Sequence, residues 1–325
     1  MSRLLRRCSV GLLGVFVLGG VLATGAAAQP GGTGGPPAWG PGQEGPDVVH
    51  QMRGNAPSGG TGTPSPLTYR GGAVVSAAGG PQILLVFWGS QWVNNDPAGV
   101  APYLESFLRS LHGAGDTWST STTQYCSGVA PGSSTCAGQA GATYVTHNAS
   151  DPVVGVFNDT AVAAPKKPSQ GQIAAEAVKA AKQYNVDPTR TQVVVATAHN
   201  NNAAGFGSSY CAWHSSTSYN GTYLAYTNLP YIPDAGSSCG ANYVSGGSVT
   251  VLQGVSIVEG HEYAETVTDP FPNSGWLDAN GAENGDKCSW IRSGQGASAY
   301  VSLNGRSFPV QSLWSNATSS CVISY

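Results

Sequence analysis

The chain has 325 residues, of which only 10% are charged, and a formal net charge of −3. This composition excludes a general nucleic-acid-binding protein, which needs a strongly basic face. We therefore expect no nucleic-acid partner.

The first 28 residues have the pattern of a secretory signal peptide. Arg3, Arg6 and Arg7 precede an apolar run over residues 10–23, and three alanines end at position 28. The run is short for a membrane span, and small residues before Gln29 suit cleavage. The sequence therefore predicts a secreted, extracellular protein that has no membrane contact after cleavage. Cleavage would remove three of the 14 basic residues and none of the 17 acidic ones, which leaves a charge of −6.

The rest of the chain divides into an arm and a domain. Residues 29–67 are rich in Gly, Pro, Ser and Thr and show almost no apolar periodicity. Such a segment cannot bury enough surface to offset the entropy of ordering, so we predict a disordered arm. Residues 68–325 have the length of one large domain with a sizeable core.

Predicted strands and helices alternate through the first part of this domain. Apolar runs predict buried strands over residues 83–88, 192–198 and 222–227, and apolar stripes predict helices over residues 102–111 and 172–184. This order is typical of an α/β domain that has a mixed sheet flanked by helices.

A further helix is predicted near residues 248–268. Ser248 is a suitable N-cap, and the helix should end by Asp269 because Pro270 disfavours helical backbone in the residue before it. After the helix, Asn304-Gly305 predicts a hairpin over residues 301–310.

Six cysteines remain after the predicted cleavage site, an even number that indicates three disulfides in an exported chain. Six cysteines allow 15 pairings, and among these we predict nearest-neighbour pairing. The predicted bonds are Cys126–Cys136, Cys211–Cys239 and Cys288–Cys321.

Acidic residues are concentrated in one segment. Seven of the 17 Asp and Glu residues fall within the 28 positions 259–286, where like charges would raise each other's pKa unless a cation or solvent relieves them. At the start of this segment, His261 and Glu265 are one helical turn apart on the same face, so both can bind one divalent metal ion. Glu262 would then lie beside the metal as a general base that activates bound water.

The third metal ligand has two candidates. We predict Glu283, and Asp269 is the alternative. The oxygen-rich segment 278–286 contains Gly281 and also resembles part of a calcium-binding loop, so a structural Ca²⁺ site is a competing interpretation. A merely solvated acidic helix face is the simplest alternative to any metal site.

His214 is a candidate for an assisting role in catalysis. It follows Cys211 by three residues, so a disulfide would hold it rigidly, and an imidazole there could stabilise an oxyanion. The alternative is a structural, hydrogen-bonded histidine.

Several segments together resemble a known family. They are Y-R-G-G-A-V (69–74), I-L-L-V-F-W-G-S-Q-W (83–92), Y-C-A-W-H (210–214), E-G-H-E-Y-A-E-T-V-T-D-P (259–270) and G-W-L-D-A-N-G-A-E-N-G-D-K-C (275–288). The set resembles the phosphate-induced protein 1 family, whose plant members are the EXORDIUM-like secreted proteins, and is most similar to bacterial relatives that carry H-E-x-x-E. The resemblance implies secretion and a common fold over most of residues 68–325. Plant members keep a T-V-T-[DN]-P-like element without the His-Glu pair, so the resemblance does not extend to plant growth roles.

The segment is also similar to zinc metallopeptidases of the H-E-x-x-H kind, with Glu265 in place of the second His. One His and two carboxylates form a harder ligand set than zinc peptidases use, which could favour Mn²⁺ or Ca²⁺. We predict a secreted zinc-dependent hydrolase, an endopeptidase acting on extracellular proteins or peptides. The alternatives are a non-catalytic extracellular binding protein that has structural Ca²⁺ and tryptophans contacting polysaccharide, or a glycosidase that uses two carboxylates about 5–10 Å apart.

Overall fold

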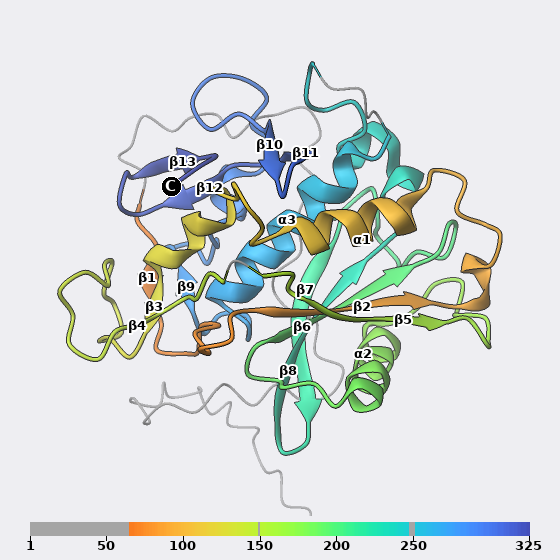
Figure 1. Ribbon diagram of the computed structural model, residues 1–325, viewed down its shortest axis with the longest axis horizontal. Coiled ribbons are helices and arrows are strands. Elements are labelled where there is room, and N and C mark those ends of the chain that lie inside the picture. Colours follow the sequence, from red (N-terminus) through yellow and green to blue (C-terminus); the bar gives the residue numbers. More distant parts are fainter. Residues whose placement is uncertain (1–64, 149, 247–250) are drawn as a thin grey trace, which may run out of the picture. The chain divides into compact units, whose positions relative to one another are not determined.

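The computed structural model describes residues 65–148, 150–246 and 251–325, which all belong to one compact unit. A five-stranded sheet with the strand order β5-β2-β6-β8-β7 forms its centre (Figure 1). The strands are β2 (Gln82–Trp88), β5 (Val153–Asp159), β6 (Thr191–Thr197), β7 (Trp213–Tyr219) and β8 (Thr222–Leu229). The first four strands in this order run parallel, and β7 pairs antiparallel with β8. The predicted mixed sheet of an α/β domain is thus confirmed.

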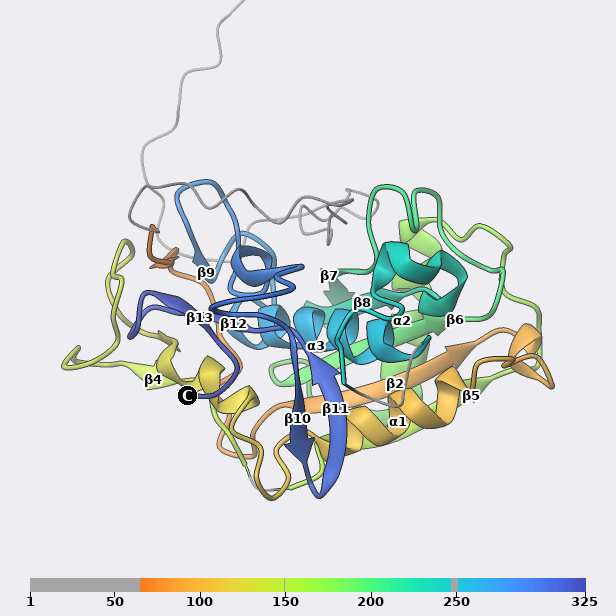
Figure 2. The ribbon, with the colours of Figure 1, turned by 90° about the horizontal axis from the view of Figure 1, so that it is seen from above.

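Helices cover both faces of the sheet. They are α1 (Val100–Ser110), α2 (Gln170–Tyr184) and α3 (Gln253–Thr268). Figures 1 and 2 show α2 on one face, and α1 and α3 on the other. Side chains along β2 alternate accordingly, because Leu84 and Val86 pack in the core with α2, whereas Ile83 and Leu85 pack in the core with α1 and α3.

Two strands of the sheet, β5 and β7, were not predicted from the sequence. In β5 the apolar run is interrupted by Gly155, which is needed for space because a Cβ there would lie 2.1 Å from the ring of Tyr184 in α2. Strand β7 reads WHSSTSY and lies at the edge of the sheet, where polar residues are tolerated.

The long helix α3 begins later than predicted. The helix starts at Gln253. Val251, which we placed in the helix, precedes it and is 45% exposed, and the expected cap Ser248 lies outside the described residues. The Gln253 side chain bonds both the backbone N–H and the backbone carbonyl of Val244, at 2.8 Å each, and so fixes the start of the helix. Its end agrees with the prediction, because Asp269 is the C-cap.

Short strands and turns complete the fold. The paired strands are β1 (Thr68–Tyr69) with β9 (Trp276–Leu277), β3 (Cys126–Ser127) with β4 (Thr143–Tyr144), β10 (Ala299–Leu303) with β11 (Arg306–Val310), and β12 (Leu313–Ser315) with β13 (Ser320–Val322). Short 3₁₀ helices are η1 (Ser90–Trp92), η2 (Ser119–Gln124), η3 (Ile232–Cys239) and η4 (Asp286–Cys288). The predicted hairpin is confirmed by β10 and β11, which turn at Asn304 (φ 49°) and Gly305 (φ 74°).

The described part of the domain begins slightly before the predicted boundary. Leu67, which we placed in the arm, is fully buried, and its backbone N–H donates to Oδ1 of Asn316 at 2.9 Å. The remainder of the predicted arm up to residue 64, and the predicted signal peptide, lie outside the described residues.

All three predicted disulfides are present. Cys126–Cys136, Cys211–Cys239 and Cys288–Cys321 are each bonded. Within the described part of the chain, none of the helices is long and apolar enough to cross a membrane. Three disulfides agree with export to an oxidising compartment.

Candidate metal centre

Helix α3 is internal over its whole length, and all 16 of its residues are buried. It nevertheless carries His261 and three glutamates, Glu259, Glu262 and Glu265, each at most 1% exposed. Charged groups are almost never fully buried unless they are paired or bind a metal ion. The contacts of these four side chains therefore decide what the helix can do.

His261 and Glu265 face one another as the helical spacing predicts. Nε2 of His261 lies 3.0 Å from Oε1 of Glu265 and 3.7 Å from Oδ1 of Asp286. The three donor atoms lie within 4.8 Å of one another. Two donors held about 2.1 Å from one ion in a tetrahedral arrangement are about 3.4 Å apart, so these spacings fit a shared divalent cation.

Gln311 fixes the orientation of the His261 ring. Its amide Nε2 donates to the backbone carbonyls of Gly285 (2.8 Å) and Ser312 (3.3 Å), so its Oε1 must be the atom that accepts from Nδ1 of His261 at 3.1 Å. With a proton on Nδ1, the neutral ring directs the lone pair of Nε2 at two carboxylates. Nε2 forms no hydrogen bond with any described residue and lies close to two carboxylates, a position that suits either a second proton or a metal ion.

The acidic surroundings of His261 stabilise a positive charge on its ring, as they would stabilise a bound cation. Burial disfavours charge on His261, but the carboxylates of Glu265 and Asp286 and the Gln311 hydrogen bond outweigh it and raise the pKa of His261 to about 9. Burial, together with the charge of Glu265, raises the pKa of Asp286 to about 7. The same negative field that protonates the ring favours a divalent ion.

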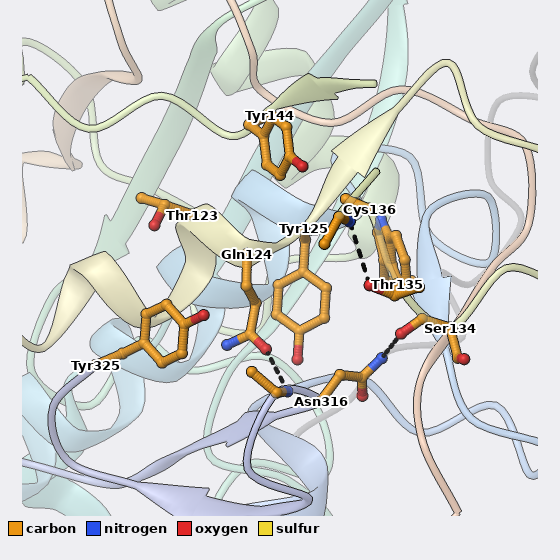
Figure 3. A pocket seen from close by; sticks show the side chains of 12 residues that line it. Thr123, Gln124, Tyr125, Ser134, Thr135, Cys136, Tyr144, Asn316 and Tyr325 are labelled. Carbon is orange, nitrogen blue, oxygen red and sulfur yellow. Dashed lines mark hydrogen bonds between the residues drawn. The ribbon is translucent and has the colours of Figure 1, made fainter. Parts of the chain in front are cut away.

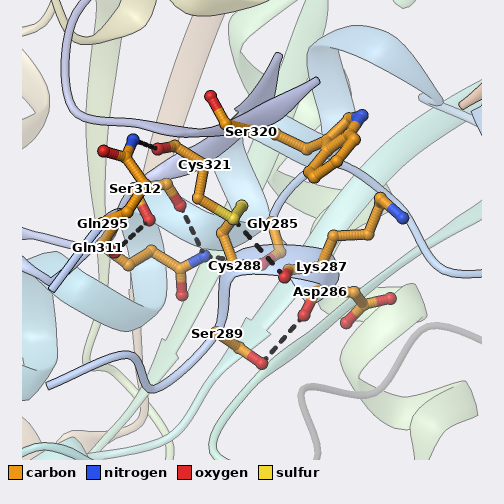
Figure 4. Close-up of a disulfide and its surroundings, with 12 residues drawn as sticks. Gly285, Asp286, Lys287, Cys288, Ser289, Gln295, Gln311, Ser312, Ser320 and Cys321 are labelled. Carbon is orange, nitrogen blue, oxygen red and sulfur yellow. Dashed lines mark hydrogen bonds between the residues drawn. A yellow bond between two sulfur atoms is a disulfide. The ribbon is translucent and has the colours of Figure 1, made fainter. Parts of the chain in front are cut away.

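The segment that carries Asp286 is held tightly against the helix. A Cβ at Gly285 would lie 2.8 Å from Nδ1 of His261 and 2.9 Å from Oε1 of Glu265, so only glycine fits. The backbone N–H of Asp286 donates to Oε1 of Glu265 at 3.0 Å. Figure 4 shows how Gln311 reaches this segment and how the disulfide Cys288–Cys321 joins it to β13.

The second carboxylate oxygen of Glu265 faces another group of residues. Oε2 lies 3.6 Å from Nδ1 of His214, which is also 3.4 Å from Oε2 of Glu262. On the far side of the same ring, Nε2 of His214 lies 3.8 Å from Oε2 of Glu283. Burial lowers the pKa of His214 to about 4, despite the opposing charge of Glu265, so this imidazole is neutral at pH 7.

The structure thus brings together most of the residues predicted from sequence but arranges them differently. Glu283, the predicted third ligand, contacts His214 rather than His261, and Asp286 takes the place beside His261. Asp269 is instead the C-cap residue of the helix, and its Oδ1 accepts from the backbone N–H groups of Ser274 (3.1 Å) and Gly275 (2.8 Å) in the turn that follows.

Two participants were missed by sequence reasoning. Asp286 had a detectable signal, because it lies in the acidic segment two residues before a disulfide cysteine. Gln311 had none, because it is 50 residues from His261 in the sequence. Glu259 also lacked an assigned role; neither of its oxygens has a partner among the described residues, and burial raises its pKa well above the ordinary value.

Asp278, the first residue of the predicted calcium loop, has local partners. Its Oδ1 accepts from the backbone N–H groups of Asn280 (2.8 Å) and Ala282 (3.0 Å), and its Oδ2 accepts from Nζ of Lys287 at 3.1 Å. A lysine ammonium therefore provides the positive charge at this carboxylate. Calcium binding by this loop stays an untested prediction.

Comparison with protein-family models, curated proteins and solved structures finds no match to this chain. The resemblance to the phosphate-induced protein 1 family consequently stays a prediction.

Proposed function

We propose that this protein is a secreted, zinc-dependent hydrolase that cleaves extracellular proteins or peptides, and that His261, Glu265 and Asp286 hold the metal. The observation that carries the proposal is Nε2 of His261, which is buried without a hydrogen bond among the described residues and faces two carboxylate oxygens. Gln311 supports it in the way that outer partners orient metal-binding histidines, by accepting from Nδ1.

The charge of the cluster supports a divalent ion. Four carboxyl groups, those of Glu262, Glu265, Glu283 and Asp286, surround only two imidazoles. Even with both rings protonated, ionised carboxylates would leave two negative charges in a largely buried site. A bound Zn²⁺ would compensate these charges, and it would polarise a scissile carbonyl and lower the pKa of water.

The chain's own residues have distinct roles in this proposal. Glu262 accepts a proton from the attacking water, and His214, neutral at pH 7 and 3.4 Å away, orients the carboxylate of Glu262. Asp286 has a side chain that is 31% exposed, whereas those of His261 and Glu265 are 1% exposed. Substrate therefore approaches from the side of Asp286.

The close carboxylates do not favour the glycosidase alternative. The Glu262 and Glu265 oxygens that face His214 lie within 4.8 Å of one another. Glycosidases place their two carboxyl groups about 5–10 Å apart across the sugar. The arrangement around His261 therefore supports a metal-dependent reaction better.

Metal content measured by mass spectrometry tests the ligand assignment. We expect one zinc per chain in the wild type and less than a tenth of that in His261→Ala and Asp286→Asn. Asp278→Asn is the control, because it removes a carboxylate of the same segment that is engaged by Lys287, and it should keep its zinc. Equal metal content in the wild type and His261→Ala would reject the site.

The general base has a separate test. Glu262→Gln should retain zinc but hydrolyse peptides at least about 100-fold more slowly, because only the proton acceptor is lost. Loss of zinc in this variant would make Glu262 a ligand, and unchanged turnover would remove it from the mechanism.

A further inference from the structure

A pocket of about 330 Å³ lies away from the proposed metal site and shares no residue with it. Its walls come from η2, from the loop closed by the Cys126–Cys136 disulfide and from the turn after β12 (Figure 3). This volume is at the lower end of the range of about 300–1,000 Å³ that small-molecule sites occupy. The pocket therefore suits a small ligand or a short stretch of a polymer.

The floor of the pocket is rigid and aromatic. Tyr125 and Trp276 are at most 1% exposed, and their ring centroids are 5.1 Å apart. The hydroxyl of Tyr125 donates to the carbonyl of Trp314 at 2.6 Å, and Nε1 of Trp276 donates to the carbonyl of Cys126 at 2.8 Å. Because both polar groups are already used inside the protein, these rings offer only apolar surface.

The rim carries two of the three exposed tyrosines in the described residues. Tyr144 is 42% exposed and Tyr325 is 52% exposed. Figure 3 shows them at separate edges of the pocket with Tyr125 between them. Neither rim hydroxyl has a hydrogen-bond partner among the described residues, whereas the third exposed tyrosine, Tyr184, donates to the carbonyl of Val156. Exposed aromatic rings that flank a pocket are typical of ligand contacts.

The remaining wall is polar but uncharged. Hydroxyls come from Thr123, Ser134 and Thr135, and no Asp, Glu, Lys, Arg or His side chain lines the pocket. The two amides are fixed in place, because Oε1 of Gln124 accepts from the N–H of Ala317 and Nδ2 of Asn316 donates to the carbonyl of Ser134. A phosphate or a carboxylate would find no positively charged side chain here.

We propose that this pocket binds a neutral saccharide, as an isolated residue or within a polysaccharide chain. A pyranose ring has apolar C–H faces and a rim of hydroxyls, and this pocket presents aromatic faces together with uncharged hydroxyls and amides. Tyr144 and Tyr325 stack on the sugar, and the threonine and serine hydroxyls bond its hydroxyls. The inference does not depend on the metal site.

Saturation-transfer NMR with defined probes tests this inference. Cellotetraose and triacetylchitotriose are the neutral probes, tetragalacturonate is the anionic probe, and p-nitrophenol tests for simple binding of apolar rings. We expect transfer to the ring protons of at least one neutral probe and at least tenfold weaker binding in Tyr144→Ala and Tyr325→Ala. Tyr184→Ala is the matched control, since it removes an exposed ring elsewhere, and it should bind like the wild type.

Several outcomes would overturn the proposal. They are no transfer to either neutral oligosaccharide, equal binding of tetragalacturonate, binding of p-nitrophenol alone, or affinities that neither rim substitution changes. Binding must also persist in His261→Ala, because loss of binding there would assign the sugar to the metal site. A circular-dichroism melt of each variant confirms that its fold is intact.

Discussion

Glu265 links the two histidines of the candidate site, His261 and His214. Its Oε1 faces His261 and accepts from the N–H of Asp286, and its Oε2 faces His214. The charge of His261 lowers the pKa of this carboxyl in spite of burial, so it is ionised at neutral pH. One ionised side chain thus couples the proposed ligands to the proposed proton acceptor.

Gly285→Ala should disrupt the metal site by crowding it. Gly285 has an ordinary helical backbone conformation, so the effect arises from the methyl group that would lie against His261 and Glu265. We expect at least tenfold weaker zinc binding in calorimetry and a loss of about 1–3 kcal/mol in the free energy of unfolding. Gly171→Ala, in the first turn of α2 with nothing within 4 Å, is the control and should gain about 0.5–1 kcal/mol. Unchanged zinc affinity in Gly285→Ala would argue against the proposed ligand positions.

His112 should make stability depend on pH, independently of the metal. Its Nδ1 accepts from the backbone N–H of Asn148 at 3.2 Å, its Nε2 bonds the hydroxyl of Tyr263, and its ring stacks on His147. Burial and the neighbouring His147 lower the pKa of His112 to about 4, although Asp116 opposes them. Between pH 6.5 and 4 the unfolded chain therefore binds a proton that the folded chain does not, so stability falls as the pH falls through this window, by up to about 3 kcal/mol.

His112→Asn isolates this contribution to stability. Asparagine tolerates the positive φ of 63° at this position and does not titrate. Urea unfolding at pH 7 and pH 4.5 should show a smaller acid-induced loss in the variant than in the wild type. The buried His214 also lowers stability as the pH falls, whereas Glu176, whose pKa is raised to about 7, increases stability as the pH falls. Both residues are present in the wild type and in the variant, so their contributions cancel in the comparison. Parallel losses in the two proteins would contradict the prediction.

At the scale of elements, the sequence predicts those features that depend on the local pattern of residues. Strands β2 and β6 are buried on both faces, so their continuous apolar runs identify them. His261 and Glu265 meet because a helix brings positions four apart together. Asp286 and Gln311 reach the same ring only through the packing of separate segments, which no sequence period reports. For this reason the sequence pattern does not distinguish Asp286 from Glu283 as a neighbour of His261.

The disulfide Cys288–Cys321 should be required for metal binding. It joins the segment that carries Asp286 to β13, whereas Cys126–Cys136 closes a loop that carries none of the proposed ligands. We expect the paired Cys→Ser change at 288 and 321 to cost about 2–5 kcal/mol and to lower zinc occupancy.

The matching double substitution at 126 and 136 provides the comparison. The disulfide that it removes closes a loop with a sequence separation of 10, compared with 33 for Cys288–Cys321. The substitution should therefore cost less stability, and it should leave zinc occupancy unchanged. Equal zinc loss in both variants, measured under conditions where both are folded, would show that general loosening and not the position of Asp286 is responsible.

For the whole molecule, chelation should reveal how much the metal contributes to stability. A ligand that binds only the folded state stabilises it by about 2.7 kcal/mol at a concentration 100 times its Kd. We therefore expect protein that is unfolded and refolded in EDTA to melt at a lower temperature, refolding with zinc to restore the melting temperature, and refolding with calcium to fail. Asp286→Asn should melt at the same temperature with and without EDTA. A wild-type melting curve that is the same after refolding in EDTA and after refolding in zinc would count against a bound metal, and restoration by calcium alone would support the structural Ca²⁺ interpretation.

The complete burial of α3 also bears on how the protein would acquire the proposed ion. His261 and Glu265 have almost no contact with solvent, and Asp286 alone of the three is partly exposed. Exchange of a bound ion then requires a local opening of the segment pinned by Cys288–Cys321, and such openings in a disulfide-bonded core are rare. An ion enclosed while the chain folds would be kinetically trapped. The metal found in the mature protein would then record the compartment in which folding took place rather than the one in which the protein works.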